Sequence, residues 1–498
     1  MRHLRSYQEA VQWLRERGAS ALRTDSRQVT AGDAFIAWPG AAVDGRAFVA
    51  QSLARGAVAC LVEQDGASAF ALDAHHVASY AGLKADAGLI AAQFYGQPSD
   101  ALPVVAVTGT NGKTSTAWWL AQALGALPAT HALSCGVIGT LGVGQPPHVQ
   151  STGLTTPDPV RVQHTLRQFW DQGLRACAME ASSIGIEEQR LAGTRIRVAV
   201  FTNFTQDHLD YHGSMEAYWL AKRKLFAWPG LAHAVVNIDD VQGAVLAGEL
   251  AKSLDLWTVS SQQPARLRAQ QVRHTASGVA FEVVEGGMSC TLQSHAIGQY
   301  NVSNLLGVIA AMRCLGVSLE SAVAACRTLL PVPGRMECVG GQGAPLVAID
   351  YAHTPDALAQ ALQALRPMAQ ARAGQLWAVF GCGGDRDASK RPLMGAIAAR
   401  HADRVLVTSD NPRSERPEAI VAQILLGLVD NKGVDVEVDR ALAIRSAVAE
   451  AAANDVVLLA GKGHEDTQEL AGIKHPFSDR AHALAALQAR QSTAGGSA

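Results

Sequence analysis

Seven short apolar runs of this 498-residue chain each end in a polar, glycine-rich or acidic cluster. They read VVAV–TGTNGKTS, ACAM–EASS, VAVF–TNFTQDHLD, LVAI–DYAHTPD, LWAVF–GCGGDRD, RVLV–TSDNPR and VVLL–AGKGHED. Helical patterns separate many of them, and strands that alternate with helices predict parallel sheets of the α/β class. Because ligands of such sheets bind beyond the carboxyl ends of the strands, the polar clusters are candidate sites.

The chain is too long for a single hydrophobic core, because domains usually contain about 100–200 residues. Two loops rich in proline and glycine divide it: GQPSDALP near residue 100, and PVPGRME at residues 331–337. We therefore expect three domains, at residues 1–102, 103–332 and 333–498.

Composition excludes several classes of protein. The net charge of −2 gives no reason to expect a nucleic-acid or anionic-membrane partner. The first 18 residues predict an amphipathic helix rather than a signal peptide, and no run reaches the roughly 18 apolar residues of a membrane span. The eight cysteines form no CxxC pair, so we expect buried, reduced thiols. A cytoplasmic protein is expected.

The string TGTNGKTS, at residues 108–115, follows the run VVAV and precedes the helical pattern STAWWLAQAL. A glycine-rich turn at a helix N-terminus directs backbone N–H groups at an anion. Lys113 would then reach the outer phosphates of a nucleotide, and Thr114 or Ser115 would bind Mg²⁺. Val107 stands where the strict phosphate-loop pattern requires glycine, so an ordinary loop is the alternative on this string alone.

Two further clusters carry candidate metal ligands. Glu180 follows ACAM, and a carboxylate at a strand end opposite a phosphate loop suits Mg²⁺; the alternative is a solvated glutamate. The cluster after VAVF contains Asn203, Asp207, His208 and Asp210, which favours a site over a structural histidine. The helix that follows contains Lys222, Arg223 and Lys224, which on spacing alone are a solvated basic face.

Together the motifs resemble those of the Mur ligase family. GTNGKTS, MEASS, TNFTQDHLDYHG, YNVSN, GRME, DYAHTPDAL and FGCGGDRD occur in the family's order and cover nearly the whole chain. The resemblance implies an N-terminal domain that binds a UDP-linked precursor, a central ATPase domain with a phosphate loop, and a C-terminal Rossmann-like domain. DNPR at residues 410–413 is similar to the signature of the diaminopimelate-adding members.

The resemblance also implies the reaction. ATP would phosphorylate the D-glutamate carboxylate of UDP-N-acetylmuramoyl-L-alanyl-D-glutamate, and an amine of meso-diaminopimelate would attack the acyl phosphate to form an amide. Such a ligase acts in peptidoglycan precursor biosynthesis and uses ATP and Mg²⁺. Its partners would be these small molecules, with no nucleic acid and no membrane, and we expect a monomer.

Residue roles carried over to the ATP site follow the matching motifs. The catalytic set is Lys113, Glu180, His208 and Lys222, and the metal ligands are Thr114, Ser115, Glu180, His208 and Lys222, the last as a carbamylated lysine. The nucleotide contacts are Gly109, Thr110, Asn111, Gly112, Lys113, Thr114, Ser115, Asn301, Asn304, Arg335, Asp350 and His353, with Tyr351 beside them.

The contacts implied for the UDP-linked precursor are Ser26, Ala41, Ala42, Val43, Thr155, Thr156, Ser182, Glu188 and Arg190. The element Asp44-Gly45-Arg46 also matches the family, with a less clear role. Three features depart from the family's usual pattern: Ile184 replaces a histidine, Glu188 replaces a glutamine, and residues 41–43 are apolar.

The contacts implied for meso-diaminopimelate are Arg386, Asp410, Asn411, Pro412, Arg413, Gly461 and Glu465. Diaminopimelate differs from lysine by one distal carboxylate, and arginine offers that group two parallel donors. Arg413 together with Arg386 suits this task, while Asp410, Asn411, Gly461 and Glu465 would grip the distal amine.

Several alternatives remain at this stage. DNPR alone also reads as a simple turn, since Asn-Pro strings favour turns. Rival functions are a folylpolyglutamate synthetase, a ligase that adds lysine, and a regulatory module that binds a nucleotide without ligating anything. A UDP-linked substrate, the choice of amino acid, and amine-dependent phosphate release separate them.

Overall fold

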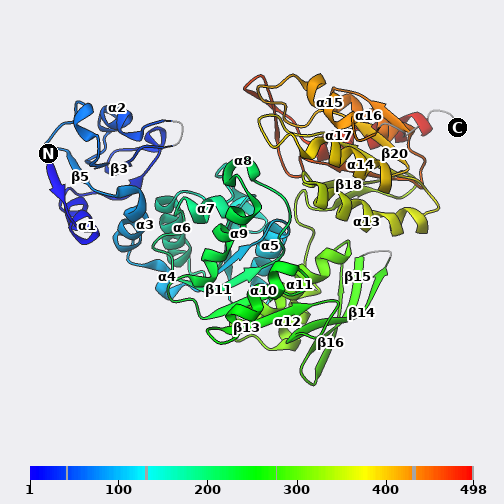
Figure 1. The fold of residues 1–498 in the computed structure, drawn as a ribbon, viewed down its shortest axis with the longest axis horizontal. Helices are drawn as coiled ribbons and strands as arrows, with labels where there is room; N and C mark the ends of the chain where they lie inside the picture. The colour runs from blue at the N-terminus through cyan, green and yellow to red at the C-terminus, as the bar shows by residue number, and fades with distance from the viewer. Residues whose placement is uncertain (41–42, 129–132, 276–277, 429–432, 496–498) are drawn as a thin grey trace.

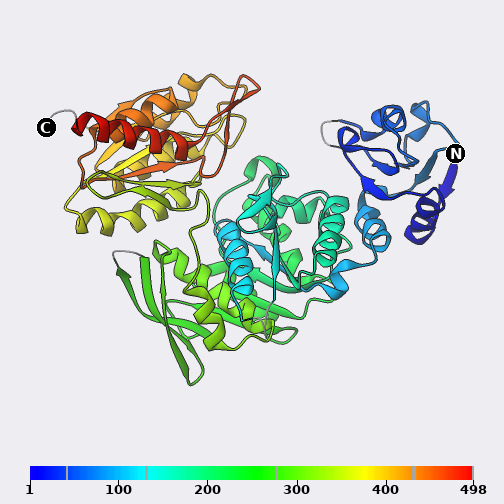
Figure 2. The ribbon, with the colours of Figure 1, turned by 180° about the vertical axis from the view of Figure 1, so that it is seen from behind.

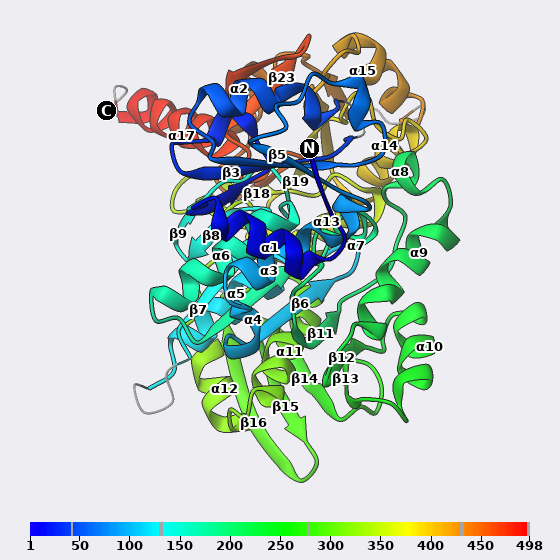
Figure 3. The same ribbon diagram turned by 90° about the vertical axis from the view of Figure 1, so that its left-hand side faces the viewer.

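The structure, a computed structural model, describes residues 1–40, 43–128, 133–275, 278–428 and 433–495. Three bodies follow one another along the chain, each around its own sheet (Figure 1). The strands of these sheets lie within residues 2–80, 104–294 and 337–460, which confirms the α/β class. Figure 2 shows the same order from behind, and Figure 3 shows it with the N-terminal body in front.

The N-terminal body contains a five-stranded parallel sheet in the order β1-β5-β4-β3-β2. Helix α1 has the predicted amphipathic character: Ser6 caps its first turn, and its apolar face, including Trp13 and Leu14, is buried. The elements are β1 (Arg2–Leu4), α1 (Tyr7–Glu16), β2 (Ala21–Arg23), β3 (Asp33–Ala37), α2 (Val49–Ala54), β4 (Ala59–Glu63), β5 (Val77–Tyr80) and α3 (Leu83–Phe94), with 3₁₀ turns η1 (Ser26–Gln28), η2 (Gly45–Phe48) and η3 (Ala67–Ala69).

The central body contains an eleven-stranded sheet in the order β16-β15-β14-β13-β12-β11-β6-β10-β7-β8-β9. The strands from β14 to β7 are parallel, and antiparallel strands extend both edges. The strands are β6 (Val104–Thr108), β7 (Cys135–Gly139), β8 (Gly142–Gln145), β9 (His148–Gln150), β10 (Ala176–Glu180), β11 (Ile196–Phe201), β12 (His233–Asn237), β13 (Asp255–Ser260), β14 (Leu267–Thr275), β15 (Gly278–Glu285) and β16 (Met288–Ser294).

Helices cover both faces of this sheet, which is why its inner strands read as continuous apolar runs. Helices α5 and α11 pack on one face and α6 and α10 on the other. The helices are α4 (Pro98–Ala101), α5 (Lys113–Gly125), α6 (Pro159–Asp171), α7 (Ser183–Glu187), α8 (Leu209–His212), α9 (Met215–Arg223), η5 (Lys224–Ala227), α10 (Val241–Leu250), α11 (Gln299–Cys314) and α12 (Leu319–Cys326).

The C-terminal body contains a six-stranded sheet in the order β17-β18-β22-β19-β20-β21, parallel except for β17. Its strands are β17 (Glu337–Gly340), β18 (Leu346–Asp350), β19 (Leu376–Phe380), β20 (Arg404–Val407), β21 (Val434–Val436) and β22 (Val456–Ala460), and β23 (Thr467–Leu470) pairs with β24 (Ile473–Pro476). The helices are α13 (Pro355–Ala371), α14 (Lys390–His401), α15 (Pro417–Leu425), α16 (Arg440–Glu450) and α17 (Asp479–Gly495).

Two expectations about the whole chain have an outcome. All eight cysteines are free thiols, six of them buried, as predicted. Among the described residues, no helix is long and apolar enough to cross a membrane.

Candidate active site

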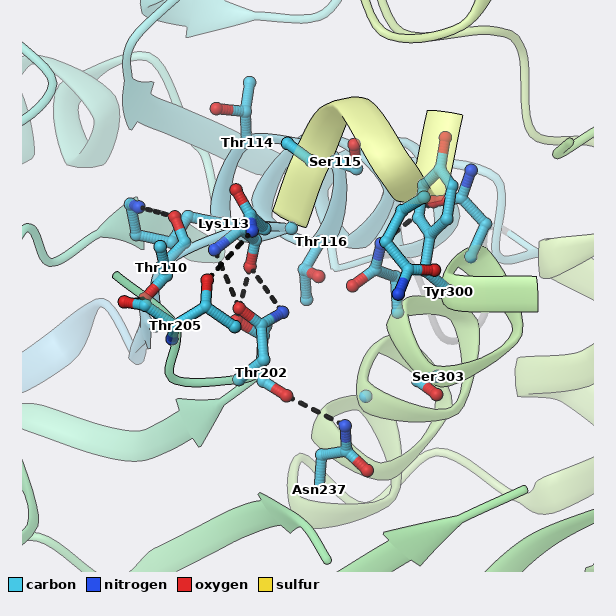
Figure 4. A pocket seen from close by; sticks show the side chains of 18 of the residues that line it. Thr110, Lys113, Thr114, Ser115, Thr116, Thr202, Thr205, Asn237, Tyr300 and Ser303 are labelled. Atoms are coloured by element: carbon cyan, nitrogen blue, oxygen red, sulfur yellow. Dashed lines mark hydrogen bonds between the residues drawn. The ribbon is translucent and has the colours of Figure 1, made fainter. Parts of the chain in front are cut away.

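A cavity of about 420 Å³ lies where the central body meets the C-terminal body. The loop between β6 and α5, the ends of β10 and β11, and the start of α11 line one side, and the end of β18 and the start of α13 line the other. Figure 4 shows the side chains of Lys113, Thr202 and Thr205 around the loop, with Tyr300 and Ser303 across from them. The polar clusters that follow β6, β10, β11 and β18 therefore meet around this cavity.

The loop at residues 109–112 requires two of its glycines. Gly109 has φ +146°, and a Cβ there would lie 1.9 Å from Thr202 Oγ1. Gly112 has φ +83°, and a Cβ would lie 2.4 Å from Asn304 Oδ1. The Asn111 N–H donates to Asn203 Oδ1 at 2.9 Å, which fixes the loop in front of α5. The result is a glycine-rich turn at a helix N-terminus, a geometry that suits an anion, despite Val107.

Two lysines, the half-buried Lys113 and the buried Lys222, converge on one carbonyl of this loop. Lys113 Nζ donates to the Gly109 oxygen at 2.9 Å, and Lys222 Nζ donates to the same oxygen at 2.7 Å. Burial lowers the pKa of Lys113, although Glu180 and Asp207 oppose the change. Burial, together with the charge of Lys113, lowers the pKa of Lys222 well below its usual value.

The spacing of Lys222, Arg223 and Lys224 predicted a solvated basic face, and this prediction is wrong for Lys222. This side chain is 1% exposed and lies 4.4 Å from the centre of the Tyr218 ring. The prediction does describe its neighbours, because Arg223 and Lys224 form surface ion pairs with Glu249 and Glu187. Helix α9 thus turns only one of its three consecutive basic residues toward the phosphate loop.

Glu180, at the end of β10, is a buried carboxylate and not a solvated one. It accepts hydrogen bonds from Thr114 Oγ1 at 2.9 Å, from Thr140 Oγ1 at 3.1 Å and from the Thr140 N–H at 2.8 Å. Arg335, which comes from the segment before β17, donates to Thr114 Oγ1 at 3.0 Å. Thr140 is a site residue that no motif indicated.

Asp207 and His208 lie after β11 and face the C-terminal body. Burial opposes ionisation of Asp207, but His353, His208 and Lys390 lower its pKa to about 2. Burial lowers the pKa of His208 to about 4, so this imidazole is neutral near pH 7. His353 Nε2 lies 3.9 Å from Asp207 Oδ2, across the boundary between the two bodies.

Residues that fit a Mg²⁺ ion are present around Glu180. Mg²⁺ takes oxygen ligands, typically one or two carboxylates with substrate phosphates. The buried Glu180 carboxylate, flanked by the Thr114 and Thr140 hydroxyls, matches that chemistry. Among the described residues, no group of three or more His, Cys, Asp or Glu side chains is gathered around one point. Any second ion would therefore need ligands from the substrates or from a modified side chain.

The remaining residues predicted for the nucleotide also reach the cavity. Asn301 and Asn304 are buried on α11 and joined by a 2.8 Å hydrogen bond. The Arg335 guanidinium lies 4.3 Å from the centre of the Tyr351 ring. Thr110, Asn111, Ser115, Asp350 and His353 line the same cavity.

The residues predicted for the UDP-linked precursor fall into two groups. Thr155, Thr156 and Ser182 lie beside the phosphate loop; Thr156 Oγ1 donates to the Glu180 carbonyl at 2.7 Å, and Arg190 Nη1 donates to the Thr156 carbonyl at 3.1 Å. The other group belongs to the N-terminal body and does not line the cavity: Ser26 donates to Gln51, and Val43 is exposed. Ala41 and Ala42 lie outside the described residues.

Two acidic residues, Glu188 and Asp44, make contacts with other parts of the protein. Glu188 forms a 2.6 Å ion pair with Lys84 of α3 and accepts from the Tyr211 hydroxyl, so it connects the N-terminal body with α8. Asp44 caps the turn η2 and pairs with the buried Arg46.

The residues predicted for diaminopimelate gather at the loops after β19, β20 and β22. Asn411 Nδ2 donates to Glu465 Oε2, and the fully buried Lys462 Nζ donates to the same Glu465 oxygen at 2.9 Å. Gly461 has φ +118°, and a Cβ there would lie 2.8 Å from Asp410 Oδ2. Asp410 Oδ1 is buried, with no hydrogen-bond partner among the described residues. Lys462 was missed, although its neighbours in GKGHED were identified.

The two arginines of this cluster keep donors available. Arg413 has φ +54° and donates from Nη1 to the Gly384 carbonyl at 2.6 Å, beside Pro412. Arg386 is half exposed, and its guanidinium lies 3.9 Å from Asp210 of α8. The rings of Tyr351 and His464 lie 5.4 Å apart and connect this cluster with the cavity.

Comparison with known proteins supplies a family. Three family descriptions match the chain: "Mur ligase family, catalytic domain" at residues 19–85, "Mur ligase middle domain" at 107–312 and "Mur ligase, glutamate ligase domain" at 334–463.

Individual proteins match over nearly the full length. A protein of Acidovorax sp. (strain JS42) named UDP-N-acetylmuramoyl-L-alanyl-D-glutamate--2,6-diaminopimelate ligase is 62% identical over 98% of both chains. A protein of the same name from Pseudomonas aeruginosa is 48% identical over 94% of this chain and 95% of the other. A solved structure with that name is 35% identical, covers 95% of both chains and has a TM-score of 0.65.

Proposed function

This chain belongs to the Mur ligase family, and we propose that it is an ATP-dependent ligase that adds meso-2,6-diaminopimelate to UDP-N-acetylmuramoyl-L-alanyl-D-glutamate. The observation that carries the proposal is the 62% identity to a ligase of that name over 98% of both chains. A folylpolyglutamate synthetase or a nucleotide-binding regulator gives no account of that identity across the N-terminal body.

The reaction requires an acyl phosphate because a free carboxylate is a poor acyl donor. The γ-phosphoryl group of ATP moves to the D-glutamate side-chain carboxylate, and ADP leaves. The neutral amine of diaminopimelate then attacks the acyl carbon, inorganic phosphate leaves with its bonding electron pair, and the new amide nitrogen loses a proton. Cations that face the transferring group lower the barrier.

The residues of the cavity would bind the nucleotide and assist phosphoryl transfer. Backbone N–H groups of residues 109–112 and the start of α5 bind the phosphates, and Lys113 neutralises the charge on the transferring group. Arg335 stacks on Tyr351 and spans both bodies, so it holds the nucleotide between them. Asn301, Asn304, Asp350 and His353 complete the nucleotide contacts.

Mg²⁺ would be held by Thr114, Ser115 and Glu180, with His208 and a carbamylated Lys222 for a second ion. When bound, it would neutralise phosphate charge. The neutral state of His208 supports this role, because a metal ligand must present a free nitrogen lone pair.

We also propose the domain division at residues 1–102, 103–332 and 333–498, and it is supported by where the strands of the three sheets lie.

Carbamylation of Lys222 is supported by its surroundings. A carbamate forms when a neutral amine attacks CO₂, and burial keeps the Lys222 amine neutral. Two ammonium groups bound to the Gly109 oxygen would repel each other, whereas an anionic carbamate next to Lys113 would be attracted.

Diaminopimelate recognition would divide between two kinds of group. Arg413 and Arg386 suit the distal carboxylate. The buried Asp410 Oδ1, which accepts no hydrogen bond among the described residues and lies 3.9 Å from Lys462 Nζ, suits the distal ammonium together with Asn411, Gly461 and Glu465. L-lysine lacks the distal carboxylate that these arginines would bind, and the loss of those charge-assisted hydrogen bonds is the physical basis for its rejection. A cytoplasmic, monomeric enzyme is part of the proposal.

The deciding experiment measures phosphate release with ATP, Mg²⁺ and UDP-N-acetylmuramoyl-L-alanyl-D-glutamate, in the presence of meso-diaminopimelate or of L-lysine. Release with diaminopimelate only is expected. Release with L-lysine would retain the ligase and overturn the role of Arg413, and release with neither would overturn the proposed function.

A further inference from the structure

Within the diaminopimelate cluster, the residues proposed for the distal ammonium lie on loops that follow two strands that are not neighbours. Asp410 and Asn411 follow β20, Gly461 and Glu465 follow β22, and β19 lies between the two strands in the sheet. The loop after β20 crosses the end of β19, where a Cβ on Gly381 would lie 2.3 Å from the Thr408 carbonyl oxygen. Sheet hydrogen bonds therefore do not set the distance between these loops directly.

A buried arginine joins the two loops. Arg440, the first residue of α16, donates from Nη1 to the Ser409 carbonyl at 3.1 Å and from Nη2 to the Ala460 carbonyl at 3.0 Å. Ser409 directly precedes Asp410, and Ala460 directly precedes Gly461. One guanidinium thus holds the backbone on both sides of the predicted ammonium site.

The orientation of Arg440 is itself fixed. Asp479, at the start of α17, accepts from Arg440 Nε at 2.8 Å and from Nη2 at 2.7 Å, and both side chains are fully buried. A planar guanidinium with several donors can bind a carboxylate and two carbonyls at once, which an ammonium group at the end of a flexible chain cannot do.

We propose that Arg440 and Asp479 are positioning residues for the incoming amino acid, because they set the separation between Asp410 and Gly461. Neither side chain lines the cavity, and their side-chain hydrogen bonds join them to each other and to the backbone of the two loops, so both act through these loops. This proposal rests on the proposed ligase function and concerns its second half-reaction only.

The chain contains a matched control at the opposite, amino-terminal ends of strands in the same sheet. Arg372 also donates to backbone carbonyls of two loops: those of Gly341 and Ala344 before β18, and those of Ala453 and Asn454 before β22. Arg372→Lys removes a similar set of hydrogen bonds from the same domain, but far from the strand ends that carry the cluster.

The test compares Arg440→Lys and Asp479→Asn with Arg372→Lys. For the first two we expect the KM for diaminopimelate to rise at least about tenfold, the cost of one charge-assisted hydrogen bond, while the KM for ATP changes less than about twofold. Acyl-phosphate formation, followed by positional isotope exchange in labelled ATP without diaminopimelate, should be unchanged. Arg372→Lys should lower the melting temperature without changing any KM.

The outcomes distinguish a failure of the positioning role from a failure of the proposed ligase function. Equal changes in the KM values for diaminopimelate, ATP and the UDP-linked precursor would show that Arg440 has a purely structural role. The same KM pattern in Arg372→Lys would show this too, and either result would overturn the proposal. If Arg440→Lys does not fold, Asp479→Asn decides alone, because it keeps an acceptor of the same shape. Wild-type enzyme that releases no phosphate with diaminopimelate would instead overturn the proposed function itself.

Discussion

The phosphate loop and the diaminopimelate cluster bury charge in opposite ways. Around the phosphate loop, Lys113 and Lys222 share one carbonyl oxygen, and burial lowers the pKa of both. In the cluster, burial raises the pKa of Asp410, and one of its oxygens has no hydrogen-bond partner among the described residues. The first region therefore suits an anionic ligand. The second already holds the buried Lys462 ammonium beside Asp410 and Glu465, and we propose that it binds the distal ammonium of the substrate as well.

The strongest test of this contrast removes the cation nearest the phosphates. Lys113→Ala should reduce kcat by at least about a thousandfold, because transition-state charge loses its main compensation. Phosphate release measures the effect, and thermal unfolding of the variant checks that the fold is intact. Near-normal turnover would remove Lys113 from the ATP site.

The next test separates a lysine from a modified lysine. Lys222→Ala should lower kcat about a hundredfold, with partial recovery on addition of short carboxylic acids that replace a carbamate. Lys224→Ala, two residues further on and in a surface ion pair, is the control and should remain active. A carbamate signal in ¹³C NMR after incubation with labelled bicarbonate should be present in the wild type and absent in Lys222→Ala. Full activity of that variant without any added acid would contradict the modification.

A smaller effect is expected in the diaminopimelate cluster, where substrate binding rather than phosphoryl transfer is affected. Arg413→Ala should raise the KM for diaminopimelate about tenfold to a hundredfold, since hydrogen bonds to charged groups contribute about 1.5–3 kcal/mol. Arg416→Ala, whose side chain is 86% exposed, provides the control. An unchanged KM for diaminopimelate in the first variant would reassign DNPR to a turn.

The smallest effect is expected for Glu188, a partly exposed charge that lies outside both regions. Glu188→Gln weakens a half-exposed pair with Lys84, so the KM for the UDP-linked precursor should change less than about threefold and the unfolding free energy less than about 1 kcal/mol. Hydrogen bonds from Lys84 and Tyr211 lower the pKa of Glu188, so any stabilisation is present above its usual pKa and is lost as the pH falls through the lowered value. Denaturant titrations at pH 7 and in acid measure it, and a large loss would show that charge matters here without burial.

Motifs predicted the parts of the site that depend on local chain geometry. Gly109, Gly112 and Lys113 form one turn, and Glu180 ends one strand, so short strings were enough to find them. Thr140 and Arg440 bind residues of distant segments, and their neighbours in sequence give no sign of those contacts. Lys462 was missed although it lies between the identified residues Gly461 and Glu465, because its bond to Asn411 joins two distant loops. Lys222 lay between the two cases: the family resemblance identified it, whereas its spacing predicted a solvent-facing residue.

The sheets were predictable for the same reason. Strands covered on both faces are uniformly apolar, so β6, β10, β11, β18, β19, β20 and β22 were all identified. The antiparallel strands β8, β9, β15 and β16 were not, because exposed edges carry mixed, weakly patterned sequences. The parallel strands β7, β12, β13 and β14 and the strands of the N-terminal sheet were not identified either.

Glu180 has one further consequence. Its carboxylate binds Thr114 and Thr140 on the nucleotide side, and its own backbone carbonyl accepts from Thr156 on the precursor side. In the proposed ligase, order imposed on one side of this residue would reduce the conformational freedom left to lose on the other, so we predict that the two binding equilibria are interdependent. Thermodynamic reciprocity then fixes the size of the effect: whatever factor ATP contributes to the affinity for the precursor, the precursor contributes to the affinity for ATP.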